Sequence, residues 1–232
     1  MTTNQAEQLT EEQRAASAVF QLEDPSKYSG FEPENEASAA AFVTALAAEF
    51  RSLPAAIRAA LRQAGNAGEL LSEDRLQGLS ELVQNADDTK ATTVRVRVDR
   101  DAVVVAHNGR GLGVGDVMAM ATPWLTTKAE DSEQTGRFGI GLQTLRSIST
   151  TLEVHGGPYH IEFGSRELRS IGPLGIEPLG DSHGWTTLRV PTSGEVDWQP
   201  LVSEWLDRWD SSALLFMSHV TRVEMIEGGT KL

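Results

Sequence analysis

The sequence of 232 residues contains no cysteine and no long hydrophobic run. Without cysteine the chain can form neither a disulfide nor a thiolate metal site, which fits a reducing compartment. No apolar stretch reaches the roughly 18 residues that a membrane-spanning helix needs. The N-terminus also lacks the basic start and apolar core of a secretory signal. We therefore expect a cytoplasmic protein that does not associate with membranes.

Positive charge is also scarce. The net charge of −13 argues against a broad nucleic-acid surface, so we expect no direct nucleic-acid binding by this domain. Residues 1–37 carry eight acidic residues against two basic ones, a net charge of −6 that leaves −7 for the rest. This composition predicts an acidic N-terminal arm, mobile or loosely docked, followed by one domain over residues 38–232.

Hydrophobic periodicity predicts the order of elements in that domain. Apolar residues recur at helical spacing within 38–51, and 92–98 alternates strictly before the continuous apolar run 102–106, which indicates a hairpin. Short strands are expected at 151–155, 159–163, 186–190 and 220–226, with a helix near 200–207. The pattern predicts an α/β (α+β) two-layer sandwich, with a mostly antiparallel mixed sheet covered by helices on one face.

One helix carries a narrow polar edge. At about 100° per residue, Asn85 lies near 40° and Asp88 near 340° when Glu81 is set to zero. The apolar side chains cluster on the opposite side, at roughly 100° to 220°: Leu76, Leu79, Leu82, Val83 and Ala86. Taken alone, such an edge is more often a solvated face than a binding site.

Two glycine-rich loops suggest backbone that approaches a ligand. Gly136, Gly139 and Gly141 open a helix, where free N–H groups and the helix dipole favour an anion. Packing alone can also place glycine there, and the loop is neither a Walker A sequence nor a Rossmann fingerprint. The segment 107–115 has glycine at four alternate positions after a buried strand. Its Asn-Gly pair could instead form a hairpin turn.

Other chemistries have less support. The five histidines are scattered without the i, i+4 pairing of a helical zinc site, and no GxSxG nucleophile elbow occurs.

The ordered set of Glu81-x-x-x-Asn85-x-x-Asp88, a hairpin, a glycine loop, GxxGxG and a late strand threonine resembles the GHKL superfamily of ATPases. ELVQNADD and GRFGIGL are most similar to the sacsin branch, whose modules are chaperone-like ATPase domains of large proteins. The resemblance covers about residues 42–225 and implies a Bergerat-type ATP-binding fold with ATP and Mg²⁺ as cofactors.

The resemblance also implies a role for each matching residue. Asn85 would ligate Mg²⁺, Glu81 would act as the catalytic general base, and Asp88 would support the nucleotide pocket. A lid at about 114–135 would carry Lys128, and Thr186 would help to bind adenine through water. The phosphates would be cradled by the second glycine loop: Gly136, Arg137, Phe138, Gly139, Ile140 and Gly141.

One position departs from the family pattern. The first glycine motif of the family begins with an aspartate that accepts the adenine amino group, whereas this sequence has His107, followed by Asn108, Gly109 and Gly111. A neutral imidazole nitrogen can accept that hydrogen bond and a protonated one cannot, while Asn108 offers a second acceptor. We therefore expect ATP to bind less tightly and less selectively than in relatives with aspartate.

The sequence thus predicts a Mg²⁺-dependent module that binds and slowly hydrolyses ATP, releases ADP, and is weak as an isolated domain. Family histidine kinases generally have Asn at the position of Glu81, so glutamate here favours hydrolysis over phosphotransfer. The expected partners are further domains of a longer chaperone-like or defence-type protein, or a separate protein. Nucleotide-linked dimerisation, common among relatives, is a further expectation. The alternative is a nucleotide-gated or non-hydrolysing interaction module with altered adenine recognition.

Overall fold

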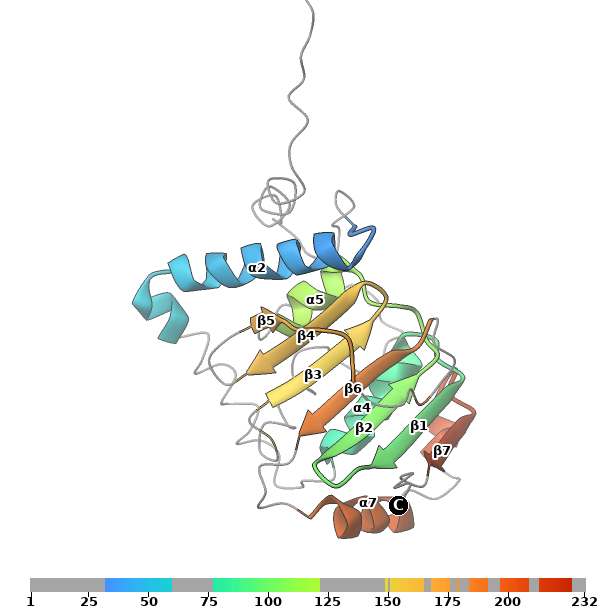
Figure 1. The fold of residues 1–232 in the computed structure, drawn as a ribbon. Helices are drawn as coiled ribbons and strands as arrows, with labels where there is room; N and C mark the ends of the chain where they lie inside the picture. Colours follow the sequence, from blue (N-terminus) through green and yellow to red (C-terminus); the bar gives the residue numbers. More distant parts are fainter. Residues whose placement is uncertain are drawn as a thin grey trace, which may run out of the picture.

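The computed structural model describes residues 32–59, 77–121, 149, 151–164, 168–175, 179, 184–191, 197–208 and 213–226. Four helices and seven strands are bounded within these ranges, together with one short 3-10 helix (Figure 1). The helices are α2 (Glu36–Ser52), α4 (Gln77–Asp88), α5 (Val114–Ala121) and α7 (Trp198–Arg208), and the 3-10 helix is η3 (Ala213–Phe216). The strands are β1 (Thr93–Val98), β2 (Ala102–His107), β3 (Thr151–Gly156), β4 (Tyr159–Gly164), β5 (Leu168–Ser170), β6 (Thr186–Pro191) and β7 (Arg222–Ile226).

The strands form one mixed sheet in the order β5-β4-β3-β6-β2-β1-β7. All neighbouring strands are antiparallel except β1 and β7, which pair in parallel with Thr93 opposite Arg222. This arrangement confirms the predicted mostly antiparallel mixed sheet. The one parallel pair joins segments far apart in the sequence.

The predicted hairpin is present as β1 and β2, with Val98 opposite Val103. Every residue of β2 is buried, whereas β1 alternates more closely between buried and half-buried positions. The continuous apolar run of β2 therefore marks a central strand covered on both faces, as buried strands generally are.

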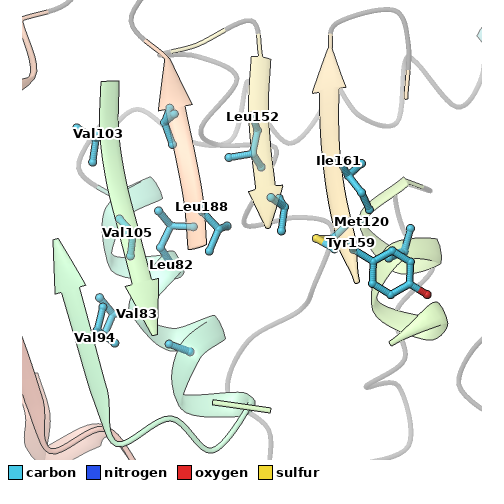
Figure 2. Packing of buried hydrophobic residues seen from close by; sticks show 14 of the residues in the cluster. Leu82, Val83, Val94, Val103, Val105, Met120, Leu152, Tyr159, Ile161 and Leu188 are labelled. Carbon is cyan, nitrogen blue, oxygen red and sulfur yellow. The ribbon is translucent and has the colours of Figure 1, made fainter. Parts of the chain in front are cut away.

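The helices cover one face of the sheet, as predicted. Side chains from α2, α4, α5 and α7 join one apolar cluster with the inward-facing residues of β1, β2, β3, β4 and β6. Figure 2 shows Leu82 and Val83 of α4 beside Val94, Val103 and Val105 of the hairpin. Their burial removes the apolar face of α4 from water, and this fixes which side of that helix remains for polar chemistry.

The other face of the central strands is covered by a smaller cluster, in which Val104 and Ala106 pack with Leu179. Arg95 of β1 lies over the ring of Trp185, 4.8 Å from its centroid, and donates a hydrogen bond to the Leu179 carbonyl oxygen at 2.7 Å. The guanidinium therefore holds this irregular segment against the sheet.

The first helix begins two residues earlier than the periodicity indicates. Asn35 caps α2 by accepting a hydrogen bond from the Ser38 backbone N–H at 2.9 Å, and the Ser38 hydroxyl accepts one from the Asn35 N–H. This reciprocal cap satisfies two donors at the helix start. Glu36 and residue 37, assigned to the acidic arm from composition, thus belong to the first turn of α2.

Two elements were not predicted. β5 has only three residues, and α5 forms within a glycine-rich and methionine-rich stretch that was expected to be the first part of a lid. Val114, Val117 and Met120 of α5 are buried in the main core. In the part of the chain that the structure describes, no helix combines the length and hydrophobicity needed to cross a membrane.

Candidate functional site

A cavity opens between α4, α5 and one end of the central strands. It comprises about 400 Å³ of space between the atoms, part of which is open solvent. Its apolar wall consists of Leu82, Leu112, Met120, Val154 and Leu188. Polar side chains among the lining residues are Asn85, Thr89, His107, Arg110, Asp116 and Thr186. An apolar wall with a few placed polar groups is the usual composition of a small-molecule site.

His107 and Thr186 meet at the inner end of this cavity. His107 is the last residue of β2 and is paired in register with Thr186, the first residue of β6. Both are buried, and the Thr186 hydroxyl has no hydrogen-bond partner within the described ranges. Gly156 at the end of β3 keeps this corner open, because a Cβ there would lie 2.9 Å from the Thr186 Oγ1.

The protonation state of His107 follows from its burial. Burial lowers the pKa of this imidazole to about 4, so the ring is neutral near pH 7. Its Nδ1 accepts a hydrogen bond from the Gly109 backbone N–H at 3.3 Å. At the position where the resemblance implies a carboxylate, this chain thus has an uncharged ring held by the loop that follows it.

Asn85 places an amide in the same cavity. The side chain is 7% exposed and its Nδ2 has no hydrogen-bond partner among the residues that the structure describes. A buried amide group without a partner costs free energy, commonly about 1–3 kcal/mol. A ligand in the cavity could supply that partner, so the amide is the strongest sign of a binding role in this helix.

Glu81 and Asp88 lie on the same polar edge of α4 as Asn85, but neither is among the cavity-lining residues. Glu81 is half-buried one turn before Asn85, and its Oε1 accepts a hydrogen bond from Gln77 Nε2 at 2.8 Å. Burial raises the pKa of the Glu81 carboxyl, and the Gln77 hydrogen bond offsets part of the rise. A carboxyl group with a raised pKa is suited to accept a proton.

An ion pair that sequence reasoning missed borders the cavity. Arg110 donates to both carboxylate oxygens of Asp116, at 2.6 and 2.8 Å, and Asp116 also accepts the Gly113 backbone N–H at 2.9 Å. Asp116 is therefore buried with its charge compensated. Its position three residues after Gly113, in the first turn of α5, is the signal that could have identified it as a helix-start residue.

The first glycine loop is shaped largely by packing. A Cβ on Gly109 would lie 2.2 Å from the Thr89 Oγ1, whereas a Cβ on Gly111 would have no atom within 4 Å. The Asn108 amide oxygen accepts the backbone N–H of Thr92 and of Thr93, at 2.9 and 3.0 Å. Asn108 thus holds the start of β1 and is not among the residues that line the cavity, and its role as a second acceptor for adenine stays a prediction.

Several predicted site residues lie outside the described residues. These are Lys128, Gly136, Arg137, Phe138, Gly139, Ile140 and Gly141. The predicted phosphate cradle and the rest of the lid are therefore known from sequence alone. Within the described ranges, no group of three or more His, Asp or Glu side chains converges as a metal site. Mg²⁺ does not need one, because it commonly takes one or two protein ligands together with phosphate oxygens and water.

The sequence profile of the family described as "Histidine kinase-, DNA gyrase B-, and HSP90-like ATPase" matches residues 72–190, just over half of the chain. The chain belongs to this family. The matched range of this GHKL domain runs from α4 through both glycine loops to β6, so it includes every wall of the cavity. The family assignment makes the domain an ATP-binding module.

A curated relative of this GHKL domain is Protein NO VEIN from Arabidopsis thaliana, 30% identical over 104 residues. The match covers 43% of this chain and 4% of that protein, so the GHKL domain is similar to a small part of a much longer chain.

Proposed function

We propose that this domain binds ATP with Mg²⁺ in the cavity between α4, α5 and the sheet, and hydrolyses it slowly within a larger chaperone-like or defence-type protein. The observation that carries the proposal is the buried Asn85 amide, which lines the cavity and whose Nδ2 has no partner in the part of the chain that the structure describes. Family membership supports the ATP part of the proposal.

The residues present fit this ligand. The Asn85 amide oxygen would hold Mg²⁺, and its Nδ2 could donate to a phosphate oxygen. The apolar wall with Leu82 and Leu188 suits a purine ring. When bound, Mg²⁺ would neutralise charge that develops on the phosphates. The cofactors proposed are thus ATP and Mg²⁺.

In this proposal Glu81 is the catalytic residue. Its carboxylate would accept a proton from the attacking water or orient that water, one helical turn from the Mg²⁺ ligand. The raised pKa of Glu81 and its half-buried position support this role. Asp88 is proposed to support the pocket from the same edge of α4.

The test compares Glu81→Gln with wild type. We expect the substitution to reduce phosphate release at least a hundredfold while the Kd for Mg²⁺-ATP changes less than threefold, because general-base catalysis commonly contributes about 10²–10⁴-fold. Glu204→Gln, which removes an exposed carboxylate of α7, is the matched control and should hydrolyse at the wild-type rate. Wild-type turnover by Glu81→Gln would exclude the general-base role.

A second candidate is a nucleotide-gated interaction module that does not hydrolyse ATP. It is favoured by Leu215 and Phe216 of η3, which are each 81% exposed beside the segment that α4 contacts through Asp87. Such exposed apolar side chains often mark an interface. Tight nucleotide binding with no phosphate release, in the longest available protein, would favour this candidate over hydrolysis.

A further inference from the structure

In the imidazole of His107 it is fixed which ring nitrogen donates a hydrogen bond and which accepts one. The ring is neutral because burial lowers its pKa to about 4, so it carries one proton. Gly109 donates its N–H to Nδ1, and a nitrogen that accepts a hydrogen bond cannot also hold the proton. The proton therefore resides on Nε2, which makes that nitrogen a donor.

This Nε2–H has no partner among the described residues. His107 is 5% exposed and lines the cavity, and among the described residues its side chain makes one hydrogen bond, in which it accepts the Gly109 N–H. An N–H group on a residue that lines a cavity pairs with a ligand only where the ligand presents an acceptor. The hydroxyl of neighbouring Thr186, which has no partner among the described residues, can either donate or accept, so it does not select between donors and acceptors on a ligand.

The apolar wall of the cavity limits which class of ligand can carry that acceptor. Leu82 from α4, Met120 from α5 and Leu188 from β6 line the same cavity, and a flat heterocycle presents both an apolar face and a polar edge. At this corner the edge of the heterocycle would meet His107, and the phosphates of the nucleotide would lie elsewhere.

We propose that His107 is a specificity-determining hydrogen-bond donor, and that this cavity prefers a nucleoside triphosphate with a 6-oxopurine base over ATP. The inference rests on the proposed nucleotide site and refines it. A carboxylate at this position can only accept, so it matches the 6-amino group of adenine. The Nε2–H of His107 can only donate, so it opposes that amino group and matches a 6-oxo group.

The expected discrimination is substantial. A base that places its amino group against Nε2–H leaves two buried donors unpaired, and sites built on a required hydrogen bond reject mismatched analogues strongly. We expect ITP and GTP to bind the wild-type domain at least tenfold more tightly than ATP. ATP would still bind through its phosphates and ring.

The experiment measures Kd by calorimetry with Mg²⁺ and ATP, ITP or GTP. ITP is the decisive probe, because it differs from ATP only at position 6 and the adjacent ring nitrogen. His107→Asp should reverse the preference toward ATP, whereas His107→Gln, which can both donate and accept, should bring the two affinities within about threefold. His219→Gln, at an exposed position outside the cavity, should leave the ITP-to-ATP ratio unchanged.

A second readout does not depend on binding. Long-range ¹H–¹⁵N spectra of the wild-type protein report which ring nitrogen of His107 is protonated. We expect the proton on Nε2 and a neutral ring down to about pH 5. This measurement decides the donor assignment even if His107→Asp fails to fold.

The outcomes separate the two proposals. ATP affinity equal to or above that of ITP, or a proton on Nδ1, overturns the role of His107 as a donor and leaves the nucleotide site standing. Failure of all three triphosphates to bind overturns the nucleotide site itself, and the inference with it.

Discussion

Asp87 and Val220 are 133 residues apart in the sequence, and a 2.7 Å hydrogen bond joins the Val220 backbone N–H to the Asp87 carboxylate. The same carboxylate accepts the backbone N–H of His219 at 2.7 Å and of Ser218 at 2.9 Å. Asp87 follows Asn85 by two residues, on a different side of α4. The helix that bears the candidate catalytic residues is thereby attached to the segment between η3 and β7.

We predict that Asp87→Asn lowers the free energy of unfolding by about 3 kcal/mol, because charge-assisted hydrogen bonds contribute about 1.5–3 kcal/mol each and an amide would place an N–H₂ group against backbone donors. Asp197→Asn is the matched control. Asp197 precedes α7 and accepts the Gln199 N–H at 3.1 Å, a cap position where Asn is as favourable as Asp. Urea unfolding of both variants is the measurement, and equal stabilities would contradict the prediction.

The Asp87 carboxylate should account for part of the decrease in the free energy of unfolding at acidic pH. Burial acts to raise the pKa of Asp87, but the three backbone hydrogen bonds from residues 218–220 outweigh it and lower the pKa below its usual value. The folded state therefore holds the charged form more strongly than the unfolded state does. The resulting stability is present above the ordinary Asp pKa of about 3.9 and is lost as pH falls through the lowered folded-state pKa. Urea titrations between pH 7 and pH 3 should show a shallower acid loss in Asp87→Asn than in wild type.

Gly109 and Gly111 provide a matched pair within one loop. We predict that Gly109→Ala lowers the free energy of unfolding by about 2 kcal/mol, the typical cost of an overpacked position, because its Cβ would lie 2.2 Å from Thr89 Oγ1 and 2.9 Å from the Thr89 carbonyl oxygen. Gly111→Ala has no atom within 4 Å of the new Cβ and should change stability by less than about 0.5 kcal/mol. Thermal unfolding of the two variants checks the difference. A similar effect of both substitutions would show that loop conformation, and not contact with Thr89, dominates.

The pH dependence of hydrolysis should report Glu81. A general base works only when deprotonated, and burial raises the pKa of Glu81, so the rate should fall on the acidic side at a pH above that of an ordinary glutamate, whose pKa is about 4.3. The Gln77 hydrogen bond lowers this pKa, so Gln77→Ala should move the acidic limb to higher pH. Phosphate release at saturating nucleotide from pH 4.5 to 8 is the measurement. A shift of the limb to lower pH in Gln77→Ala would contradict the assignment.

Much of the fold could be predicted because local patterns determine it. Strict alternation in 93–98 and the apolar run in 102–107 defined the hairpin, and the apolar face of α4 was assigned correctly at Leu79, Leu82, Val83 and Ala86. β5 escaped prediction because three residues carry no measurable period. α5 escaped because neighbouring glycines suggested a loop, whereas its helix is stabilised by burial of Val114, Val117 and Met120.

In the candidate site, too, some residues could be predicted from local patterns and others depend on contacts between distant parts of the chain. Asn85, Thr186 and His107 were predicted as site residues from their order along the chain, and in the structure all three line one cavity. Asp87 was not identified, since its role depends on backbone donors 131–133 residues away that no local pattern reveals. The donor polarity of His107 likewise required the contact with Gly109, which sequence spacing does not determine.

The parallel pairing of β1 with β7 has a consequence for folding. Thr93 of β1 and its partner Arg222 are separated by 129 residues, so the ribosome needs on the order of 10 s to add β7 after β1. During that interval one edge of β1 has no partner, and such edges promote aggregation unless charged side chains interrupt them. Arg95 and Arg97 place two guanidinium groups on β1, where they pair with Glu224 and Asp99 once folding is complete. We expect these arginines to protect the newly synthesised chain from strand-to-strand association until β7 arrives.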